Sequence, residues 1–269
     1  MDAAAISERY AFAATLIADA GSLSLGYFRD RASLEIASKG LQDMASQADL
    51  ETERLIRDRI AESCPDDAFF GEETGGIAPA PGQGVWVVDP IDGTANFVSA
   101  IPMWCVSIAF VVDEVIEFGL VLDPNHDELF AARRGHGATL DGQPIRPDDT
   151  TSLAEGRIGI SFSHRSKPHQ VSGLIHGLLE CGGLYNGPVG GALGLAYVAC
   201  GRTIGYYEPH INSWDCYGAI AVLREAGAWV CDAESGDGLV AGCEIIAAAP
   251  GVKQPFLDLL AAVKAAQAG

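Results

Sequence analysis

The chain has 269 residues, 48% of them hydrophobic, which is enough to fill the core of one large domain or of two closely joined ones. Its net charge of −19, with no run of Lys or Arg to offset it, disfavours nucleic acid and anionic lipid as partners. No uninterrupted apolar run approaches the roughly 18 residues of a membrane span, and the first residues lack the positive region of a secretory signal. The seven cysteines include no C-x-x-C pair, which favours reduced thiols and a cytoplasmic protein over a disulfide framework or a zinc site.

The first half of the chain is predicted to contain two helices followed mainly by strands. Apolar residues at helical spacing predict an amphipathic helix over Ile6–Phe28. Ser46 and Asp49 have the spacing of a helix cap followed by an acid three positions on, and this second helix should end near Ser63. Gly and Pro between residues 71 and 84 predict a loop. Short β-rich runs then predict a buried strand, a hairpin and a further strand before a glycine-rich turn: Val85–Val88, Cys105–Val112, Val115–Leu122 and Asp127–Ala132.

After about residue 150 the pattern changes to strands that alternate with helices. Strands are predicted over Arg157–Phe162, Thr203–Tyr207, Ala228–Cys231 and Glu244–Ala248. Helices are predicted over Pro168–Cys181, Ala192–Cys200, Trp214–Glu225 and Pro255–Ala266. The sequence therefore predicts a mixed α/β (α+β) fold with a hairpin-rich half over residues 1–150 and an alternating half over residues 151–269. No low-complexity linker separates the two halves.

The segment Asp89-Pro90-Ile91-Asp92-Gly93-Thr94 has the chemistry of a metal and phosphate site. Asp89 ends an apolar strand, where an unpaired carboxylate is costly to bury. Pro90 fixes the turn that brings Asp92 close, so two like charges crowd one place. Mg²⁺ relieves this repulsion, because it prefers carboxylate, carbonyl and water oxygens. Gly93 and Thr94 open a predicted short helix, whose free N–H groups can bind phosphate.

Taken alone, the same segment is also typical of an ordinary turn capped by an aspartate. Three motifs in register decide between the two interpretations, because together they resemble the inositol monophosphatase family. That family has G-E-E, then D-P-I/L-D-G-T-x-N-F, then W-D-x-A/G-A, and the likeness extends over about residues 39–248. This chain has Gly71-Glu72-Glu73, Asp89-Pro90-Ile91-Asp92-Gly93-Thr94-Ala95-Asn96-Phe97 and Trp214-Asp215-Cys216-Tyr217-Gly218-Ala219.

The resemblance implies a set of metal ligands. Glu72, Asp89 and the Ile91 carbonyl are expected to hold one Mg²⁺. A second ion is expected on Asp89, Asp92 and Asp215, with Asp89 bridging the two. A third, weaker ion would rest on Glu72 and water. Mn²⁺ is the expected substitute for Mg²⁺.

The resemblance also assigns the reaction. Gly93 and Thr94 should offer backbone N–H groups to the phosphate. The Thr94 hydroxyl and Asp49, aided by Glu72, should orient and deprotonate the attacking water, which one metal ion makes nucleophilic near neutral pH. The second ion should steady the leaving alkoxide during in-line displacement, so no protein nucleophile is needed.

Four further residues are assigned by the same resemblance. Asp92 and Glu208 match acids that contact the substrate, and an ordinary carboxylate at a strand end is the less favoured alternative for Glu208. Glu73 has either a direct role or a capping role. Lys39 matches a lysine near the third metal ion, but an exposed lysine before a glycine is equally consistent with the sequence.

Two positions depart from the family pattern. Asn186 stands where the family usually has an arginine, and Ile204 stands where a G-x-x-D pattern would place an acid. Both departures concern the substrate pocket or the contacts of a dimer. They leave the metal and phosphate residues intact.

The leading hypothesis is a magnesium-dependent phosphatase that hydrolyses inositol monophosphate or a similar small polyol or sugar phosphate. Histidinol phosphate and a nucleoside 3′,5′-bisphosphate are alternative substrates within the same chemistry. A regulatory protein of the transcription machinery is the alternative from another class, since some members of the family bind that machinery. By resemblance we expect a layered α-β-α-β-α sandwich, a homodimer and inhibition by lithium.

Overall fold

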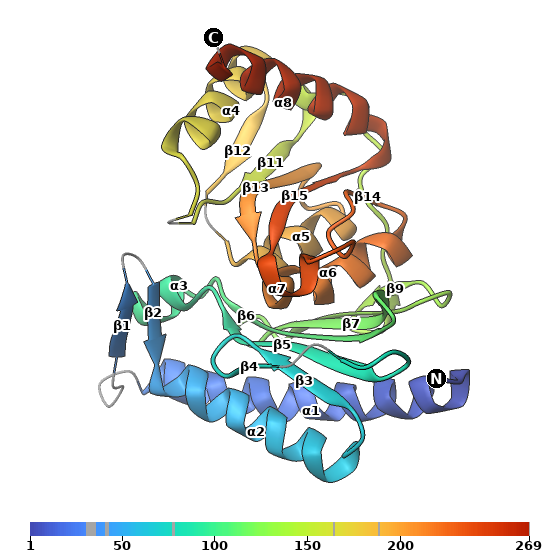
Figure 1. The fold of residues 1–269 in the computed structure, drawn as a ribbon. Helices are drawn as coiled ribbons and strands as arrows, with labels where there is room; N and C mark the ends of the chain where they lie inside the picture. The colour runs from blue at the N-terminus through green and yellow to red at the C-terminus, as the bar shows by residue number, and fades with distance from the viewer. Residues whose placement is uncertain (31–35, 41–42, 77–78, 164, 188, 269) are drawn as a thin grey trace.

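A computed structural model gives the fold (Figure 1). It describes the backbone of residues 1–30, 36–40, 43–76, 79–163, 165–187 and 189–268, and the side chains of these ranges except 36–40, 43–45 and 267–268.

Two long helices form the first layer. Helix α1 spans Ala3–Arg29 and begins at Asp2, whose carboxylate accepts the Ala5 N–H at 2.8 Å. Helix α2 spans Gln47–Ser63, and the predicted cap at its start is a capping box made by Ser46 and Asp49. Among the described helices α1 alone is long and apolar enough to cross a membrane. In this fold its apolar face packs against the first sheet.

The first sheet has eight strands in the order β10-β9-β8-β7-β6-β5-β3-β4. Strand β5, Gly84–Asp92, is buried along its whole length, pairs in parallel with β3 and is antiparallel to β6. The predicted loop over residues 71–84 was wrong at its start, because Gly71 ends β3 and Gly75–Gly76 pair with β3 as the short strand β4. The other strands are β3 Ala68–Gly71, β6 Cys105–Val112, β7 Val115–Asp123, β8 Glu128–Arg133, β9 Ala138–Leu140 and β10 Gln143–Pro144.

The second sheet has five strands in the order β12-β11-β13-β15-β14. Strand β11 runs parallel to both of its neighbours, whereas β15 is antiparallel to β13 and β14. Strand β13 ends later than predicted, with a register shift between Glu208 and Ile211 that contains Pro209, a residue without an N–H for the ladder. The strands are β11 Arg157–Ile160, β12 Leu184–Asn186, β13 Gly205–Ile211, β14 Trp229–Val230 and β15 Cys243–Ala248.

The layers follow the order helix, sheet, helix, sheet, helix (Figure 1). Helices α1 and α2 cover one face of the first sheet, α5 and α6 lie between the sheets, and α4 and α8 cover the outer face of the second sheet. This arrangement confirms the predicted layered α-β-α-β-α sandwich. The predicted helices of the second half are present as α4 Pro168–Glu180, α5 Gly191–Ala199, α6 Ser213–Ala226 and α8 Lys253–Ala268.

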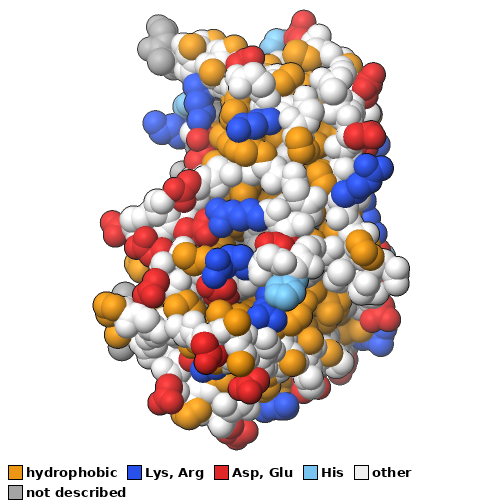
Figure 2. Space-filling model, turned by 90° about the vertical axis from the view of Figure 1, so that its right-hand side faces the viewer, with side chains coloured by type: hydrophobic (Ala, Val, Ile, Leu, Met, Phe, Trp, Pro, Cys, Tyr) orange, Lys and Arg blue, Asp and Glu red, His pale blue; other side chains and the backbone are white. Residues whose placement is uncertain are grey.

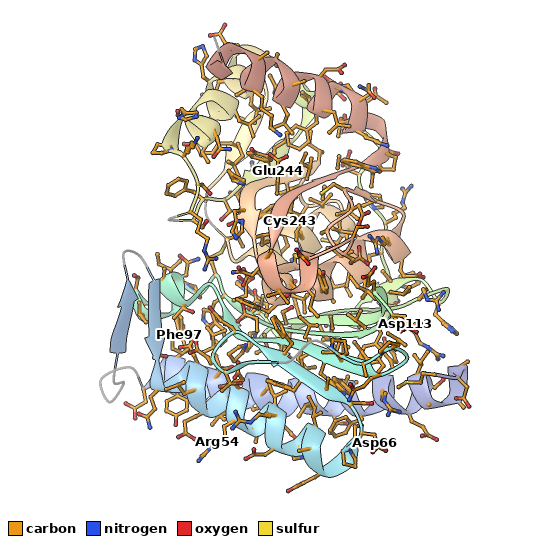
Figure 3. The ribbon with its side chains drawn as sticks, viewed as in Figure 1. Arg54, Asp66, Phe97, Asp113, Cys243 and Glu244 are labelled. Atoms are coloured by element: carbon orange, nitrogen blue, oxygen red, sulfur yellow. The ribbon has the colours of Figure 1, made fainter. Side chains whose placement is uncertain are left out.

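The remaining elements are short. A hairpin of β1, Ile36–Gly40, and β2, Asp43–Ser46, precedes α2. The short helix predicted after Gly93 is α3, Thr94–Val98. Phe97 anchors α3 beside the end of α1, where its ring packs against Phe28 at 5.3 Å and Trp104 at 4.8 Å between ring centroids (Figure 3). The chain also forms α7, Gly238–Ala241, and two 3₁₀ turns, η2 Leu153–Glu155 and η3 Pro250–Val252.

Candidate active site

A cleft of about 640 Å³ opens where the two sheets meet, and it gathers residues from widely separated parts of the chain. One side of the cleft is formed by the end of β5, by α3 and by the start of α6. The other side is formed by β11, α4 and β12. The lining residues that carry the argument below are Glu72, Asp89, Ile91, Asp92, Gly93, Thr94, Glu208 and Asp215.

Three aspartates form the first carboxylate cluster. One oxygen from each of Asp89, Asp92 and Asp215 lies within 4.8 Å of the others. Asp89 and Asp92 come from the end of β5, and Asp89 accepts the Ile91 N–H at 2.9 Å. Asp215 is the third residue of α6 and closes a capping box, accepting from the Asn212 backbone and side-chain amides at 3.1 and 3.0 Å. The end of β5 and the start of α6 therefore bring their acids together at one point.

This crowding makes the first cluster hard to ionise without a cation. Burial raises the pKa of Asp89 well above its ordinary value, and the negative charges of Glu72 and Asp215 raise it further. Burial also raises the pKa of Asp215. The Asp89 and Asp215 carboxylates lie close enough to repel each other strongly when both are ionised. A divalent cation would supply the missing positive charge.

Backbone N–H groups at the start of α5 bind the Asp92 carboxylate. Its two oxygens accept the Gly191 and Ala192 N–H groups at 2.9 and 2.7 Å, 99 and 100 residues along the chain. Gly190 allows this approach, because a Cβ there would lie 2.5 Å from an Asp92 oxygen. Burial nevertheless raises the Asp92 pKa to about 7, although these two hydrogen bonds act in the opposite direction.

A second carboxylate cluster lies on the α2 side of the cleft. Oxygens of Asp49, Glu72 and Glu73 lie within 4.8 Å of one another. Asp49 accepts the Ser46 N–H at 2.8 Å and the Ser46 hydroxyl at 2.6 Å, while burial raises its pKa. Glu73, for which the sequence left a capping role and a direct role open, is part of this cluster.

Thr94 joins the two clusters. Its hydroxyl lies 3.0 Å from Asp49 Oδ1 and 3.1 Å from the Ile91 carbonyl oxygen, although Asp49 is 45 residues away in sequence. Gly93 precedes it with φ +97°, a conformation that side-chain-bearing residues rarely adopt, and thereby turns the chain into α3. The resemblance assigns Thr94 and Asp49 to the attacking water, and the structure brings these two side chains into contact.

Glu53 is a site residue that the sequence interpretation missed. Its buried carboxylate accepts the Glu73 and Thr74 N–H groups at 2.8 and 2.9 Å and the Thr74 hydroxyl at 2.6 Å. Gly71 packs directly on it, since a Cβ there would lie 2.4 Å from Glu53 Oε2. The sequence signal for it was its place four residues after Asp49, on the same helix face.

Glu208 lies on the opposite side of the cleft from α2, on β13. The Tyr206 hydroxyl donates to its carboxylate at 2.8 Å, and burial raises the Glu208 pKa to about 8. The residue therefore lines the cleft in a form that can exchange a proton near neutral pH.

Neither of the two departures from the family pattern belongs to an acid cluster. Asn186 ends β12 with its side chain half-buried, beside Gly187 of the cleft wall. Ile204 is buried in the apolar core of the second sheet, where an acid would be costly. Lys39 lies on β1, and its side chain is outside the described residues.

The whole chain matches a known protein family. The family model described as inositol monophosphatase family matches residues 5–267. The chain belongs to the inositol monophosphatase family. An inositol-1-monophosphatase of Rhizobium meliloti is 36% identical over 213 residues, covering 78% of this chain and 79% of that protein.

Members of the family with a different name are equally similar. A protein of Haemophilus influenzae named Nus factor SuhB is 34% identical over 242 residues, covering 89% of this chain and 90% of that protein. The crystal structure of the extragenic suppressor protein suhB from Bartonella henselae superposes with a TM-score of 0.84 at 31% identity, covering 93% of this chain and 96% of that one. The family thus supports a metal-dependent phosphatase and leaves the substrate open.

The carboxylates of this member of the inositol monophosphatase family fit divalent cations. The oxygens of each group of three acids lie within the span of a single coordination sphere, and the first group lines the cleft together with Glu72 of the second. Glu72 lies between the groups, since its charge acts on Asp89 while its oxygen belongs to the Asp49 group. Hard oxygen donors of this kind favour Mg²⁺ or Mn²⁺ over metals that prefer nitrogen or sulfur.

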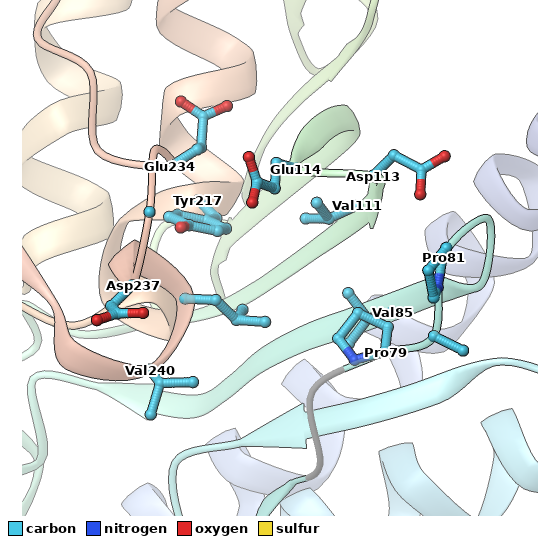
Figure 4. A pocket seen from close by; sticks show the side chains of 13 residues that line it. Pro79, Pro81, Val85, Val111, Asp113, Glu114, Tyr217, Glu234, Asp237 and Val240 are labelled. Atoms are coloured by element: carbon cyan, nitrogen blue, oxygen red, sulfur yellow. The ribbon is translucent and has the colours of Figure 1, made fainter.

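A second cavity, of about 420 Å³, lies elsewhere and does not suit a phosphate ester (Figure 4). Its walls combine apolar residues such as Val85 and Val111 with carboxylates from several elements, among them Glu114 and Asp237. None of the residues of the two metal-type clusters lines it. Among the described residues its carboxylates form no group of three that could hold a metal ion, so they would repel an anionic substrate, and the cleft between the sheets is the candidate active site.

Proposed function

We propose that this member of the inositol monophosphatase family is a magnesium-dependent phosphomonoesterase that hydrolyses a small phosphorylated alcohol such as inositol monophosphate. The observation that carries the proposal is that the first carboxylate cluster and Glu72 line one cleft, where Glu72 also belongs to the second cluster. Carboxylates gathered in this way can hold the pair of ions that two-metal phosphoryl transfer uses.

The ligands are those that the family resemblance implies, and the first of the two sets coincides with the first carboxylate cluster. Asp89, Asp92 and Asp215 would hold one ion, and Glu72, Asp89 and the Ile91 carbonyl would hold the other. A third, weaker ion would rest on Glu72. When bound, these ions lower the pKa of a coordinated water and neutralise charge on the phosphoryl oxygens.

Asp49 and Thr94 prepare the attacking water. The Thr94 hydroxyl donates to Asp49, so its lone pairs are left to accept a hydrogen bond from water. Asp49 is well suited to take up the proton, because burial raises its pKa. The water oxygen forms a new P–O bond, the P–O bond to the alcohol breaks, and the alcohol leaves with a proton from water. Phosphate and the free alcohol are the products.

The start of α3 and the wall opposite α2 orient the ester. Gly93 and Thr94 would direct backbone N–H groups at the phosphate. Glu208 and Asp92 would accept hydrogen bonds from the alcohol part, since both line the cleft.

Phosphate release from a substrate panel tests this function. The panel holds inositol 1-phosphate, glucose 6-phosphate, histidinol phosphate and adenosine 3′,5′-bisphosphate, each with Mg²⁺ and with a chelator. We expect turnover with Mg²⁺ that the chelator abolishes. Absence of turnover of every compound with both Mg²⁺ and Mn²⁺ would contradict the proposal.

A role in transcription is the second candidate, favoured by the relative named Nus factor SuhB. We propose it as additional to catalysis, because the predicted ligand side chains all stand in this chain. On the face drawn in Figure 2, Lys and Arg side chains are interspersed with acidic and apolar ones, which disfavours RNA itself as the partner. Retention of purified RNA polymerase on the immobilised protein, measured across a salt series, tests this role.

Three further expectations come from the family and stand as proposals. The protein would be cytoplasmic, homodimeric and inhibited by lithium. Light scattering measures the dimer, and phosphate release in the presence of LiCl measures the inhibition.

A further inference from the structure

The wall of the cleft that faces the alcohol part of a substrate is apolar. Below the cleft mouth lie the carboxylates, whereas the wall formed by β11, α4 and β12 presents hydrocarbon and aromatic side chains. These lining residues are Ile160, Phe162, Val171, Ile175, Tyr185 and Val189.

Two aromatic rings of this wall are open to water. Phe162 follows β11 and is 40% exposed, and Tyr185 lies on β12 and is 46% exposed. Both line the same cleft as the acids, with half-buried Val171 and Ile175 from α4 beside them. Large apolar side chains that remain exposed inside a ligand cleft gain free energy when a ligand covers them.

The polar groups on this wall are few. Apart from the acids of the metal site and Thr94 and Asn96 of α3, the described polar groups that line the cleft are the side chains of Ser161, Ser163 and Glu208 and the hydroxyl of Tyr185. One oxygen of Glu208 accepts from Tyr206, and the Ser163 hydroxyl lies 3.4 Å from that of Ser166. A ring that bears a hydroxyl on every carbon would place several hydroxyls against hydrocarbon without partners, which costs binding free energy.

We propose that the preferred substrate is the phosphate monoester of an alcohol whose body carries an apolar ring, held between Phe162 and Tyr185. This inference rests on the proposed phosphatase function and names its substrate class. The hydrolysis is unchanged: water replaces the alcohol on phosphorus, and the ring-bearing alcohol leaves. Phe162 and Tyr185 supply the selectivity for such a ring, because offset or edge-to-face ring contacts add to the binding free energy gained by burying apolar surface.

Three phosphate esters of matched chemistry test the inference. With Mg²⁺ present, kcat/KM is measured for 2-phenylethyl phosphate, for inositol 1-phosphate, and for glycerol 2-phosphate, which is too small to reach the wall. We expect 2-phenylethyl phosphate to exceed inositol 1-phosphate by about tenfold or more.

Variants then locate the selectivity. Phe162→Ala and Tyr185→Ala should each lower kcat/KM for 2-phenylethyl phosphate about tenfold relative to glycerol 2-phosphate. Leu184→Ala is the matched control, because Leu184 is 53% exposed on β12 and does not line the cleft. It should leave the ratio between the two substrates unchanged.

The outcomes separate the two proposals. A preference for inositol 1-phosphate, or equal losses on both substrates in Phe162→Ala and Tyr185→Ala, would overturn the apolar substrate class and leave the phosphatase standing. If none of the three esters is hydrolysed with Mg²⁺ or Mn²⁺, both the phosphatase and the substrate class are overturned.

Discussion

Glu53 accepts two hydrogen bonds from Thr74, one from its N–H at 2.9 Å and one from its hydroxyl at 2.6 Å. The other Glu53 oxygen accepts the Glu73 N–H at 2.8 Å. A buried carboxylate on α2 thereby fixes the turn that presents Glu72 and Glu73 to the cleft. The same helix carries Asp49 one turn earlier, so α2 positions the whole second carboxylate cluster.

Glu53→Gln should weaken Mg²⁺ binding. The amide replaces one acceptor oxygen with a donor, so at least one buried N–H of the turn loses its partner, at a cost of about 1–3 kcal/mol. We expect the Mg²⁺ dissociation constant from calorimetric titration to rise about tenfold. Glu51→Gln is the control, because Glu51 lies on the same helix and pairs at the surface with Arg54. Equal Mg²⁺ affinity in Glu53→Gln and the wild type would contradict the positioning role.

Gly218→Ala should separate α6 from the first sheet. A Cβ at Gly218 would lie 2.7 Å from Ser107 Oγ and 3.1 Å from the Leu120 carbonyl oxygen. The steric clash should lower the free energy of unfolding by about 1–3 kcal/mol. Because Asp215 lies in the first turn of α6, a shift of this helix should also weaken Mg²⁺ binding. Gly26→Ala is the control: it lies in α1, where an added Cβ would meet nothing within 4 Å, and it should be neutral or stabilising in urea unfolding. An unchanged free energy of unfolding in Gly218→Ala would contradict the close approach of α6 to the first sheet at Gly218.

Asp67→Ala should destabilise the α1 layer. Asp67 accepts from Arg9 at 2.7 and 2.9 Å and from the Trp86 indole N–H at 3.0 Å, with 2% of its side chain exposed. Removing it leaves the Arg9 Nε and Nη2 donors and the indole N–H without their shared acceptor, while Arg9 Nη1 keeps its hydrogen bond to the Ala5 carbonyl at 3.2 Å. We therefore expect a loss of about 3 kcal/mol in urea unfolding. Asp19→Ala breaks an exposed pair with Arg59 and should cost under about 1 kcal/mol. Equal effects of the two substitutions would argue against the buried pair.

Glu208→Gln should change how stability depends on pH. Burial raises the folded Glu208 pKa to about 8, above the value of about 4.3 in an unfolded chain. The folded state therefore binds more protons between these values, and its stability falls as pH rises through this window. In chelator, we expect Glu208→Gln to gain in Tm over the wild type between pH 5 and pH 9. A Tm difference between Glu208→Gln and the wild type that stays constant from pH 5 to pH 9 would contradict the raised pKa of Glu208.

The parts of the site that could be predicted from the sequence are formed by residues that lie close together in the chain. Asp89, Asp92 and Thr94 lie within one short segment, so the strand and turn between them fix their proximity. The cap of α2 was also readable, because Ser46 and Asp49 contact each other three residues apart. The layered fold was predictable by resemblance, since the chain carries the family motifs in order.

Contacts between distant segments were not predictable from local pattern. The hydrogen bonds from Gly191 and Ala192 to Asp92 cross 99 and 100 residues and depend on how α5 packs between the sheets. In the sequence Glu53 cannot be distinguished from an ordinary acid on a helix, because its partner Thr74 belongs to a distant turn. The short strands β4, β9 and β10 were missed because two or three residues give no periodicity to detect.

The apolar wall of the cleft was hidden for the same reason. Phe162, Val171 and Tyr185 lie in three different segments, and each is an ordinary residue in its own segment. Only the second sheet and α4 bring them to one surface.

Magnesium-dependent phosphate release in the wild type and in Asp89→Asn tests the two-cluster site most directly. Asp89 is the acid shared by both proposed ions, and Asn keeps its shape while removing the charge. We expect turnover in the wild type that rises and saturates with Mg²⁺, and a loss of at least about 1,000-fold in kcat for Asp89→Asn, comparable to removing a major source of transition-state stabilisation. Turnover in Asp89→Asn within a fewfold of the wild type at the same Mg²⁺ concentration would contradict the site.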